Sequence, residues 1–440
     1  MGSFDDQIDK IPPLTTVVTV AALLALAVMA MPPRRRLQFA LAQMSLIMAI
    51  SRLQSLGSLA ILAKILTAVG VGLVAASALA HPGPRRRTVL LNWASVVASA
   101  IGIVVVTGAD DWQKAVFLRG QAFLLTLTAI WVSQTIVEGR DLRDVFLGFF
   151  WGAGAGTVVA MSALIVEPSV AFAAGLGRFQ PYGCNPVQIG VLFACAAPLG
   201  VYFSLHASRR GVQQFYMTLA ALAMAGAVLT VSRMAIGAIA LTSAPCMFRM
   251  ARRPLVMIGL LLAATALAWN LMARFEDSNF AHLQASQESH RLAYTEEVMG
   301  EVRLRPWFGL LTSHGELAHP PDLNAHNSHV ELLYLGGVAL AAPNALLMLL
   351  ASYGAFRVTA GPRRREFGKL LCPTVALLFA TTVINSMVNF ITNYPSYTFT
   401  FVHALLLQFF LMAGSGRPSS PTASLRQKQT RAPIRVAAAA

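Results

Sequence analysis

Charged residues are scarce in this sequence, and their scarcity excludes an ordinary soluble domain. Lysine, arginine, aspartate and glutamate together make up 12% of the 440 residues, whereas 56% are hydrophobic. A soluble domain carries about 25% charged residues. Apolar runs of about 20 residues, the length that crosses a hydrocarbon core, recur from end to end of the chain. The sequence therefore predicts a polytopic membrane protein.

Cysteines are also few, and no CxxC motif occurs. The four cysteines, Cys184, Cys195, Cys246 and Cys372, lie far apart along the chain. We interpret them as small packing residues rather than as metal ligands or a disulfide framework.

The short alternating segments of a transmembrane barrel are missing as well. The long apolar runs instead predict an all-α fold, a polytopic bundle of 12 or 13 transmembrane helices with one long periplasmic loop that contains interfacial helices. The expected division is N-terminal transmembrane helices in 1–273, the loop in 274–328, C-terminal transmembrane helices in 329–413 and a disordered, basic cytoplasmic tail in 414–440. The expected spans are 14–31, 37–50, 58–80, 88–107, 116–137, 145–166, 187–205, 214–231, 234–248, 255–273, 329–356, 370–388 and 396–413.

The net charge of +15 is concentrated in short clusters between the apolar runs. This is the positive-inside pattern, which assigns the clusters to the cytoplasm and argues against a nucleic-acid partner. The clusters are PPRRR (32–36), HPGPRRR (81–87), HASRR (206–210), RMARRP (249–254) and GPRRREFGK (361–369).

Arginines on the opposite side of the membrane are not needed for orientation, so they carry information about function. Arg233 is the clearest case, because it interrupts the apolar stretch LTVSRMAIGAIAL (229–241). A charge deep in the bilayer costs about 2.5–3.5 kcal/mol. Two interpretations stay open: a turn residue that reaches the headgroups, or an anion site in which guanidinium groups hold a phosphate. The other outer arginines are Arg178, Arg274, Arg291, Arg303 and Arg305.

A polar cluster, NAHNSHVELLYLGG (324–337), stands at the entrance of an apolar helix. His314, His319, His326 and His329 raise a zinc hypothesis, but HNSHVE is not an HExxH motif and no regular ligand spacing recurs. We therefore expect no metal and no other cofactor. A neutral imidazole near the membrane surface suits a general base instead. Asn327 either orients that base or caps the helix that begins near Ser328.

Four short motifs together resemble the superfamily of bacterial O-antigen ligases and polysaccharide polymerases. They are GCNPVQIG (183–190), SRMAIGAIAL (232–241), SHRLAYTEEVMGEVRLRPWFGL (289–310) and AHNSHVELLYLGG (325–337). Their order matches the superfamily's NP turn, its SR motif, its long periplasmic loop with an arginine before P-x-x-G, and its HN pair at a helix start. Two departures are Val187, where the family has asparagine, and LLTSHG (310–315), a reduced form of the usual glycine-rich stretch.

This resemblance implies a multi-pass protein of the bacterial inner membrane whose active site faces the periplasm. Its substrates would be an undecaprenyl-diphosphate-linked glycan and an acceptor, either lipid A–core or a growing polysaccharide. Carried over by motif, Arg233 and Arg291 would bind the diphosphate and His326 would be the catalytic base. Asn327, Arg178 and Asn185 would support them. Direct displacement would invert the anomeric centre without a metal.

A transporter or lipid flippase is the competing interpretation. It predicts charged residues deep within several helices, for which Lys64 and Arg119 are candidates, although both are expected near outer helix ends. The acidic pair Asp110-Asp111 is interpreted as a solvated outer turn.

Overall fold

The structure, a computed structural model, describes residues 12–105, 112–172, 177–250, 293, 295–309, 327–361, 364–388 and 398–415. Regular secondary structure in these residues is helical, apart from one isolated antiparallel bridge between Phe172 and Phe179. The N-terminal helices are α2 (Leu14–Ala30), α3 (Pro33–Ile50), η1 (Gln54–Leu56), α4 (Ser58–Leu79), α5 (Leu90–Val105), α6 (Trp112–Thr135) and α7 (Gly139–Val166). There follow η3 (Pro181–Gly183), α8 (Pro186–His206), α9 (Arg210–Leu229), α10 (Arg233–Met250), α13 (Ser328–Ala360), α14 (Arg364–Phe367), α15 (Leu371–Val388) and α16 (Thr398–Ser415).

The bundle has the apolar exterior of a membrane protein. Five described helices, α4, α7, α8, α9 and α13, are long and apolar enough to cross a membrane, and five shorter apolar helices accompany them. Large apolar side chains cover outward faces, including Leu90 (84% exposed), Ile165 (85%) and Leu349 (68%). A water-soluble bundle would place polar residues on such faces. The predicted all-α membrane fold is confirmed at this level.

Helices α3 and α7 begin several residues earlier than the hydropathy pattern predicts. Helix α3 begins at Pro33, where proline suits the first helical position, so the arginines 34–36 lie in its first turn. Helix α7 begins at Gly139 rather than near 145, because Glu138 and Asp141 form a reciprocal capping box. In both cases capping chemistry, rather than the apolar run, sets the helix end.

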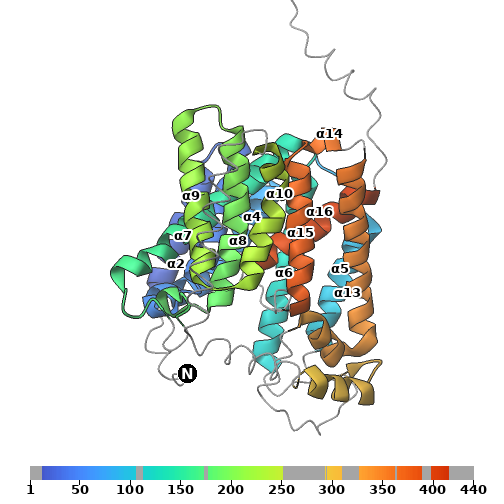
Figure 1. The fold of residues 1–440 in the computed structure, drawn as a ribbon. Coiled ribbons are helices and arrows are strands. Elements are labelled where there is room, and N and C mark those ends of the chain that lie inside the picture. Colours follow the sequence, from blue (N-terminus) through green and yellow to red (C-terminus); the bar gives the residue numbers. More distant parts are fainter. Residues whose placement is uncertain are drawn as a thin grey trace, which may run out of the picture.

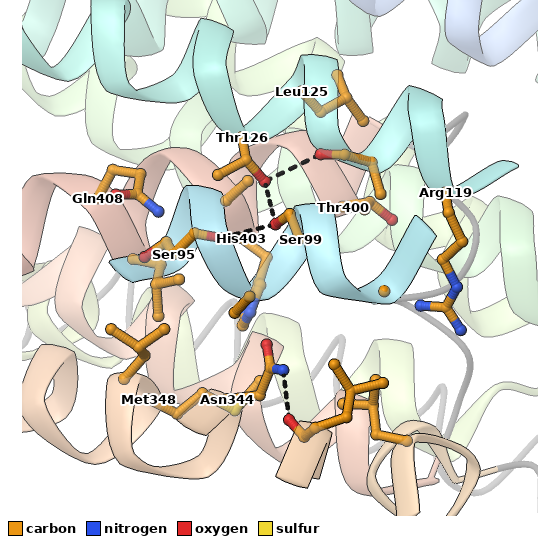
Figure 2. Close-up of a pocket in the computed structure, with 18 residues that line it drawn as sticks. Ser95, Ser99, Arg119, Leu125, Thr126, Asn344, Met348, Thr400, His403 and Gln408 are labelled. Atoms are coloured by element: carbon orange, nitrogen blue, oxygen red, sulfur yellow. Dashed lines mark hydrogen bonds between the residues drawn. The ribbon is translucent and has the colours of Figure 1, made fainter. Parts of the chain in front are cut away.

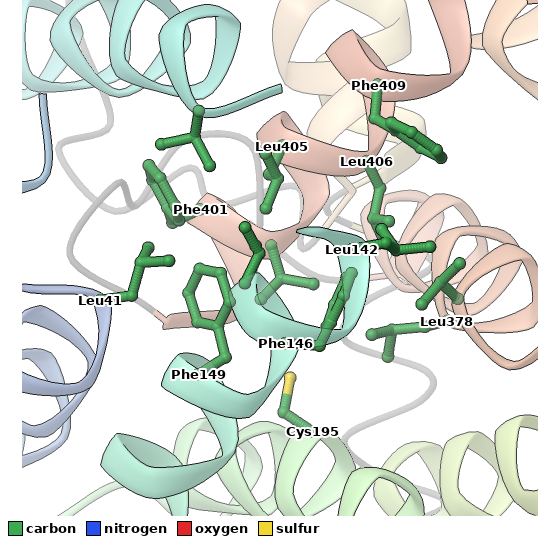
Figure 3. Packing of buried hydrophobic residues seen from close by; sticks show 14 of the residues in the cluster. Leu41, Leu142, Phe146, Phe149, Cys195, Leu378, Phe401, Leu405, Leu406 and Phe409 are labelled. Carbon is green, nitrogen blue, oxygen red and sulfur yellow. The ribbon is translucent and has the colours of Figure 1, made fainter. Parts of the chain in front are cut away.

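Helix α7 lies at the centre of the largest hydrophobic core (Figure 3). Phe146 and Phe149 of α7 are buried, and the Phe149 ring lies 5.5 Å from that of Phe401 in α16. Leu41 of α3 and Cys195 of α8 approach α7 from other sides. Helix α7 therefore joins the N-terminal helices to the C-terminal ones.

A glycine stripe on α7 lets α3 pack closely against it. Gly148, Gly152 and Gly156 are spaced four residues apart, so they share one face of the helix. A Cβ on Gly148 would lie 2.5 Å from the Gln38 carbonyl oxygen, and one on Gly156 would lie 2.6 Å from the Ala49 Cβ. Close backbone approach through small residues is the usual way in which membrane helices associate.

The described parts of the basic clusters gather at one end of the bundle, the end where α14 and the α8–α9 connection lie (Figure 1). Arg86 donates hydrogen bonds there to the carbonyls of Ile136 (2.7 Å) and Val137 (3.0 Å) at the end of α6. It also forms an ion pair with Glu366 of α14 at 2.9 Å and stacks over the Phe367 ring. The start of α13 and the helical residues 295–304 lie at the opposite end (Figure 1).

Candidate functional site

The segment before α8 is held against the turn between α9 and α10. The Arg178 Nε donates to the carbonyl of Thr230 (3.0 Å), and the backbone N–H of Phe179 donates to the carbonyl of Leu229 (2.9 Å). Helix α10 begins at Arg233, three residues after Thr230. The structure therefore places Arg178 beside the backbone of the SR motif.

Two of the predicted motifs also pack against each other directly. A Cβ on Gly190, the last residue of GCNPVQIG, would lie 3.2 Å from the Ser232 Cβ and 3.1 Å from the Ala235 Cβ. Both of these residues belong to SRMAIGAIAL. The motifs at 183–190 and 232–241 are thus neighbours in space, although about forty residues separate them in the sequence.

Asn185 has a structural role in this arrangement. Its side chain accepts the backbone N–H of Val187 at 2.9 Å, so it caps α8, with Pro186 at the first helical position. The neighbouring Cys184 is buried, and burial raises the pKa of its thiol to about 12. The thiol is therefore protonated at neutral pH and is not a nucleophile.

The P-x-x-G motif packs into a kink of α13. Gly337 adopts a φ of +59° inside that helix, which interrupts the regular ladder of hydrogen bonds. The freed N–H groups of Val338 and Ala339 donate instead to the carbonyls of Pro306 (2.8 Å) and Trp307 (3.0 Å). Gly309 also has a positive φ, and a Cβ there would lie 2.7 Å from the Gly337 nitrogen. Glycine is required at both positions.

The helical residues before this motif pack on the start of α13. Val298 and Val302 are buried, and they contact Val330 and Leu333. Leu304 (74% exposed) and Trp307 (68%) face outward. Residues 295–304 are helical, and part of their apolar face packs against protein.

Asn327 caps α13, as one of the two interpretations of the sequence has it. Its side-chain oxygen accepts the N–H groups of His329 (2.9 Å) and Val330 (3.3 Å). The His329 Nε2 lies 3.1 Å from the Ser386 hydroxyl, whose proton is donated to the Val383 carbonyl. The Nε2 of His329 therefore carries a proton and donates to Ser386, which fixes the ring to α15.

The remaining predicted residues are not placed. His326 and Arg291 lie outside the described residues, as do Asp110 and Asp111, and only the backbone of Arg233 is described. Across the described part of the chain, no three histidine, cysteine, aspartate or glutamate side chains converge as metal ligands would.

The structure adds one feature that the sequence did not predict, a cavity of about 110 Å³ with a mixed polar and apolar lining between α5, α6, α13 and α16 (Figure 2). Arg119, Asn344, His403 and Gln408 are among its lining residues. Each is a polar or charged residue in a mostly apolar helix, and only Arg119 was named from the sequence, as a candidate for the transporter interpretation. Their convergence depends on the packing of four helices.

Comparison with protein-family models finds no match to this chain, and comparison with curated proteins finds none either.

Proposed function

We propose that the protein is a membrane glycosyltransferase of the O-antigen ligase and polysaccharide polymerase type. It would transfer a glycan from an undecaprenyl-diphosphate carrier to an acceptor sugar, on the periplasmic side of a bacterial inner membrane. The observation that carries the proposal is the pairing of its motifs. The segment 183–190 packs on 232–241, and 306–309 packs into the kink at Gly337, nine residues after the start of α13 at Ser328.

The proposed chemistry is a direct displacement. The acceptor hydroxyl oxygen attacks the anomeric carbon, the bond from that carbon to the phosphate oxygen breaks, and undecaprenyl diphosphate leaves. His326 accepts the hydroxyl proton, and the anomeric configuration is inverted. Because the diphosphate is already a good leaving group, charge neutralisation and positioning are the main requirements. In this proposal Arg233 and Arg291 supply them, since guanidinium groups bind phosphate in bidentate fashion.

The positions of the described residues support this division of roles. The Asn327 side chain is occupied by the cap of α13, and the Nε2 of His329 is directed to Ser386. The Asn327 amide therefore belongs to the helix cap, whereas the His329 ring, held by Ser386, keeps a lone pair only on Nδ1. His326 immediately precedes the cap, so a rigid helix end would hold it.

The first test is His326→Ala in a complementation assay, with the amount of protein in the membrane measured. A positioned base contributes about 10²–10⁴-fold, so ligation or polymerisation should be almost lost. His319→Ala, another histidine of the same loop, is the matched control and should retain activity. Full product formation by the His326 variant would refute its role as base.

The two possible acceptors, lipid A–core and a growing polysaccharide, are distinguished by gel electrophoresis of the glycans that a deletion strain makes. Loss of long polymer indicates a polymerase. Carrier-linked polymer that is retained without attachment indicates a ligase.

A transporter or flippase is the second candidate, and the observation that favours it is Arg119 on the wall of an internal cavity. In that case a deletion strain would accumulate the carrier-linked glycan on the cytoplasmic face. A glycosyltransferase deletion would leave it on the outer face, where a membrane-impermeant glycosidase can reach it.

A further inference from the structure

The cavity between α5, α6, α13 and α16 encloses polar groups within an otherwise apolar bundle (Figure 2). Its volume of about 110 Å³ exceeds several times the roughly 10–15 Å³ that one water molecule needs by this measure. Polar groups in such a place are costly unless a partner satisfies them. The hydrogen bonds around the cavity show which polar atoms have partners among the described residues and which kind of ligand would satisfy the others.

The Gln408 side chain, on the cavity wall, carries a hydrogen-bond donor that the described residues leave unsatisfied. The Asn92 side-chain oxygen accepts the N–H of Val89 (3.0 Å), which fixes the orientation of the Asn92 amide. Its nitrogen then donates to the Gln408 Oε1 (2.7 Å), so the Gln408 Nε2 points away from Asn92. This Nε2 is fully buried and has no hydrogen-bond partner among the described residues.

His403 presents an acceptor. The Thr382 hydroxyl donates to the Phe379 carbonyl (2.6 Å), so it can only accept from the His403 Nδ1, which lies 2.8 Å away. The neutral ring therefore carries its proton on Nδ1 and keeps a lone pair on Nε2. His403 is 5% exposed and lines the cavity.

The Gln408 donor and the His403 acceptor, both on α16, determine which chemical groups a ligand of this cavity needs. A phosphate oxygen accepts hydrogen bonds and cannot donate to the His403 Nε2, whereas a hydroxyl group does both. Ser99 and Thr126, whose hydroxyl oxygens lie 3.4 Å apart, add further hydroxyl groups to the wall. Arg119 adds a cation that Glu331 partly balances through its charge. The lining thus suits a molecule with several hydroxyl groups.

The cavity also reaches the end of the bundle where the proposed site lies. Leu332, on its wall, is in the second turn of α13 and six residues after His326. Thr400 is in the first turn of α16, and Gln408 lies about 12 Å deeper along the same helix.

We propose that this cavity is a sugar-binding subsite, in which different hydroxyl groups of one sugar ring accept from Gln408 and donate to His403. The inference rests on the proposed glycosyltransferase function and assigns a sugar ring of the substrate to this cavity.

The test is saturation-transfer NMR on the full-length protein in phospholipid nanodiscs, without sugar detergents. The probes are the methyl glycosides of glucose, galactose and N-acetylglucosamine at millimolar concentration. Tetrahydropyran, a ring of similar shape without hydroxyl groups, is the control probe. We expect saturation transfer to at least one glycoside and none to tetrahydropyran.

Two variants connect the signal to the cavity. Gln408→Leu removes the donor and should weaken binding about three- to tenfold, the effect of one hydrogen bond. Ala122→Leu removes no polar group but fills the cavity from the α6 wall, so it should abolish the signal in a folded protein. Gln214→Leu, the same amide replacement at an exposed position of α9, should change nothing.

Absence of transfer to every glycoside would mean that the cavity holds water alone and would overturn the proposal. A signal that Ala122→Leu leaves unchanged would overturn it as well. The measurement needs no activity, so its failure is distinguishable from failure of the glycosyltransferase proposal, which the His326→Ala assay tests.

Discussion

Asn327 is adjacent in sequence to the proposed base, His326. The hydrogen bonds of its side chain indicate a structural role rather than a catalytic one. Its side-chain oxygen accepts two N–H groups in the first turn of α13. These are donors that a helix start otherwise leaves without partners. A residue whose side chain is used in this way holds the helix end in place and thereby positions whatever precedes it.

We therefore predict that Asn327→Ala destabilises the protein by about 1 kcal/mol, the usual cost of losing a cap. Asn327→Asp and Asn327→Ser keep a capping oxygen and should restore the melting temperature, measured by fluorescence-detected size-exclusion chromatography after heating. Activity should follow stability across the three variants. If the Asp and Ser variants are stable but inactive, the amide itself takes part in the reaction.

The His403 and Gln408 positions show why single residues escaped prediction. Gln408 meets Asn92 across 316 positions of sequence. Hydropathy identifies the apolar run that contains each residue, but not the face of the helix that the neighbours cover. A single sequence therefore does not distinguish a polar residue that faces lipid from one that lines a cavity.

Helix ends and kinks were predictable from the sequence only where the residues that cause them are adjacent in the chain. The start of α13 was predictable because the asparagine cap and the apolar run adjoin in the sequence. The kink at Gly337 was not, because its cause is a backbone segment about thirty residues upstream that accepts the freed N–H groups. A Cβ on Gly337 would meet the backbone of Trp307 and Phe308, so this glycine allows the upstream segment to approach closely.

The glycine stripe of α7 gives a prediction about helix packing. Gly152 faces α3, where an added Cβ would lie 3.0 Å from the Leu46 backbone nitrogen and also meet the Ala42 carbonyl and Ser45. Backbone atoms cannot move aside as a flexible side chain would. Gly152→Leu should therefore separate α3 from α7 and cost about 3 kcal/mol or more.

The matched control is Gly72→Leu, because Gly72 lies within α4 with no atom near the position of an added Cβ. Thermal unfolding in detergent should show a large loss for the Gly152 variant and little change for the Gly72 variant. Equal melting temperatures for the two variants would show that close contact between α3 and α7 is not needed for stability.

The distribution of charge over the molecule predicts its orientation. The α8–α9 connection lies at the end of the bundle where the described basic clusters gather, and the segment 306–309 that packs into the α13 kink lies at the opposite end (Figure 1). The positive-inside rule predicts that the first end is cytoplasmic. The proposed reaction requires the second end to face the periplasm, so a measurement of the orientation also tests the proposed function.

Substituted cysteines test this orientation, and the four native cysteines are buried, so they give little background. A membrane-impermeant maleimide added to cells with a permeabilised outer membrane should label Trp307→Cys, whose side chain is 68% exposed. It should not label Ser208→Cys in the exposed α8–α9 connection until the inner membrane is also opened. The opposite labelling pattern would place the motif end in the cytoplasm and would contradict the periplasmic site that the proposed function requires.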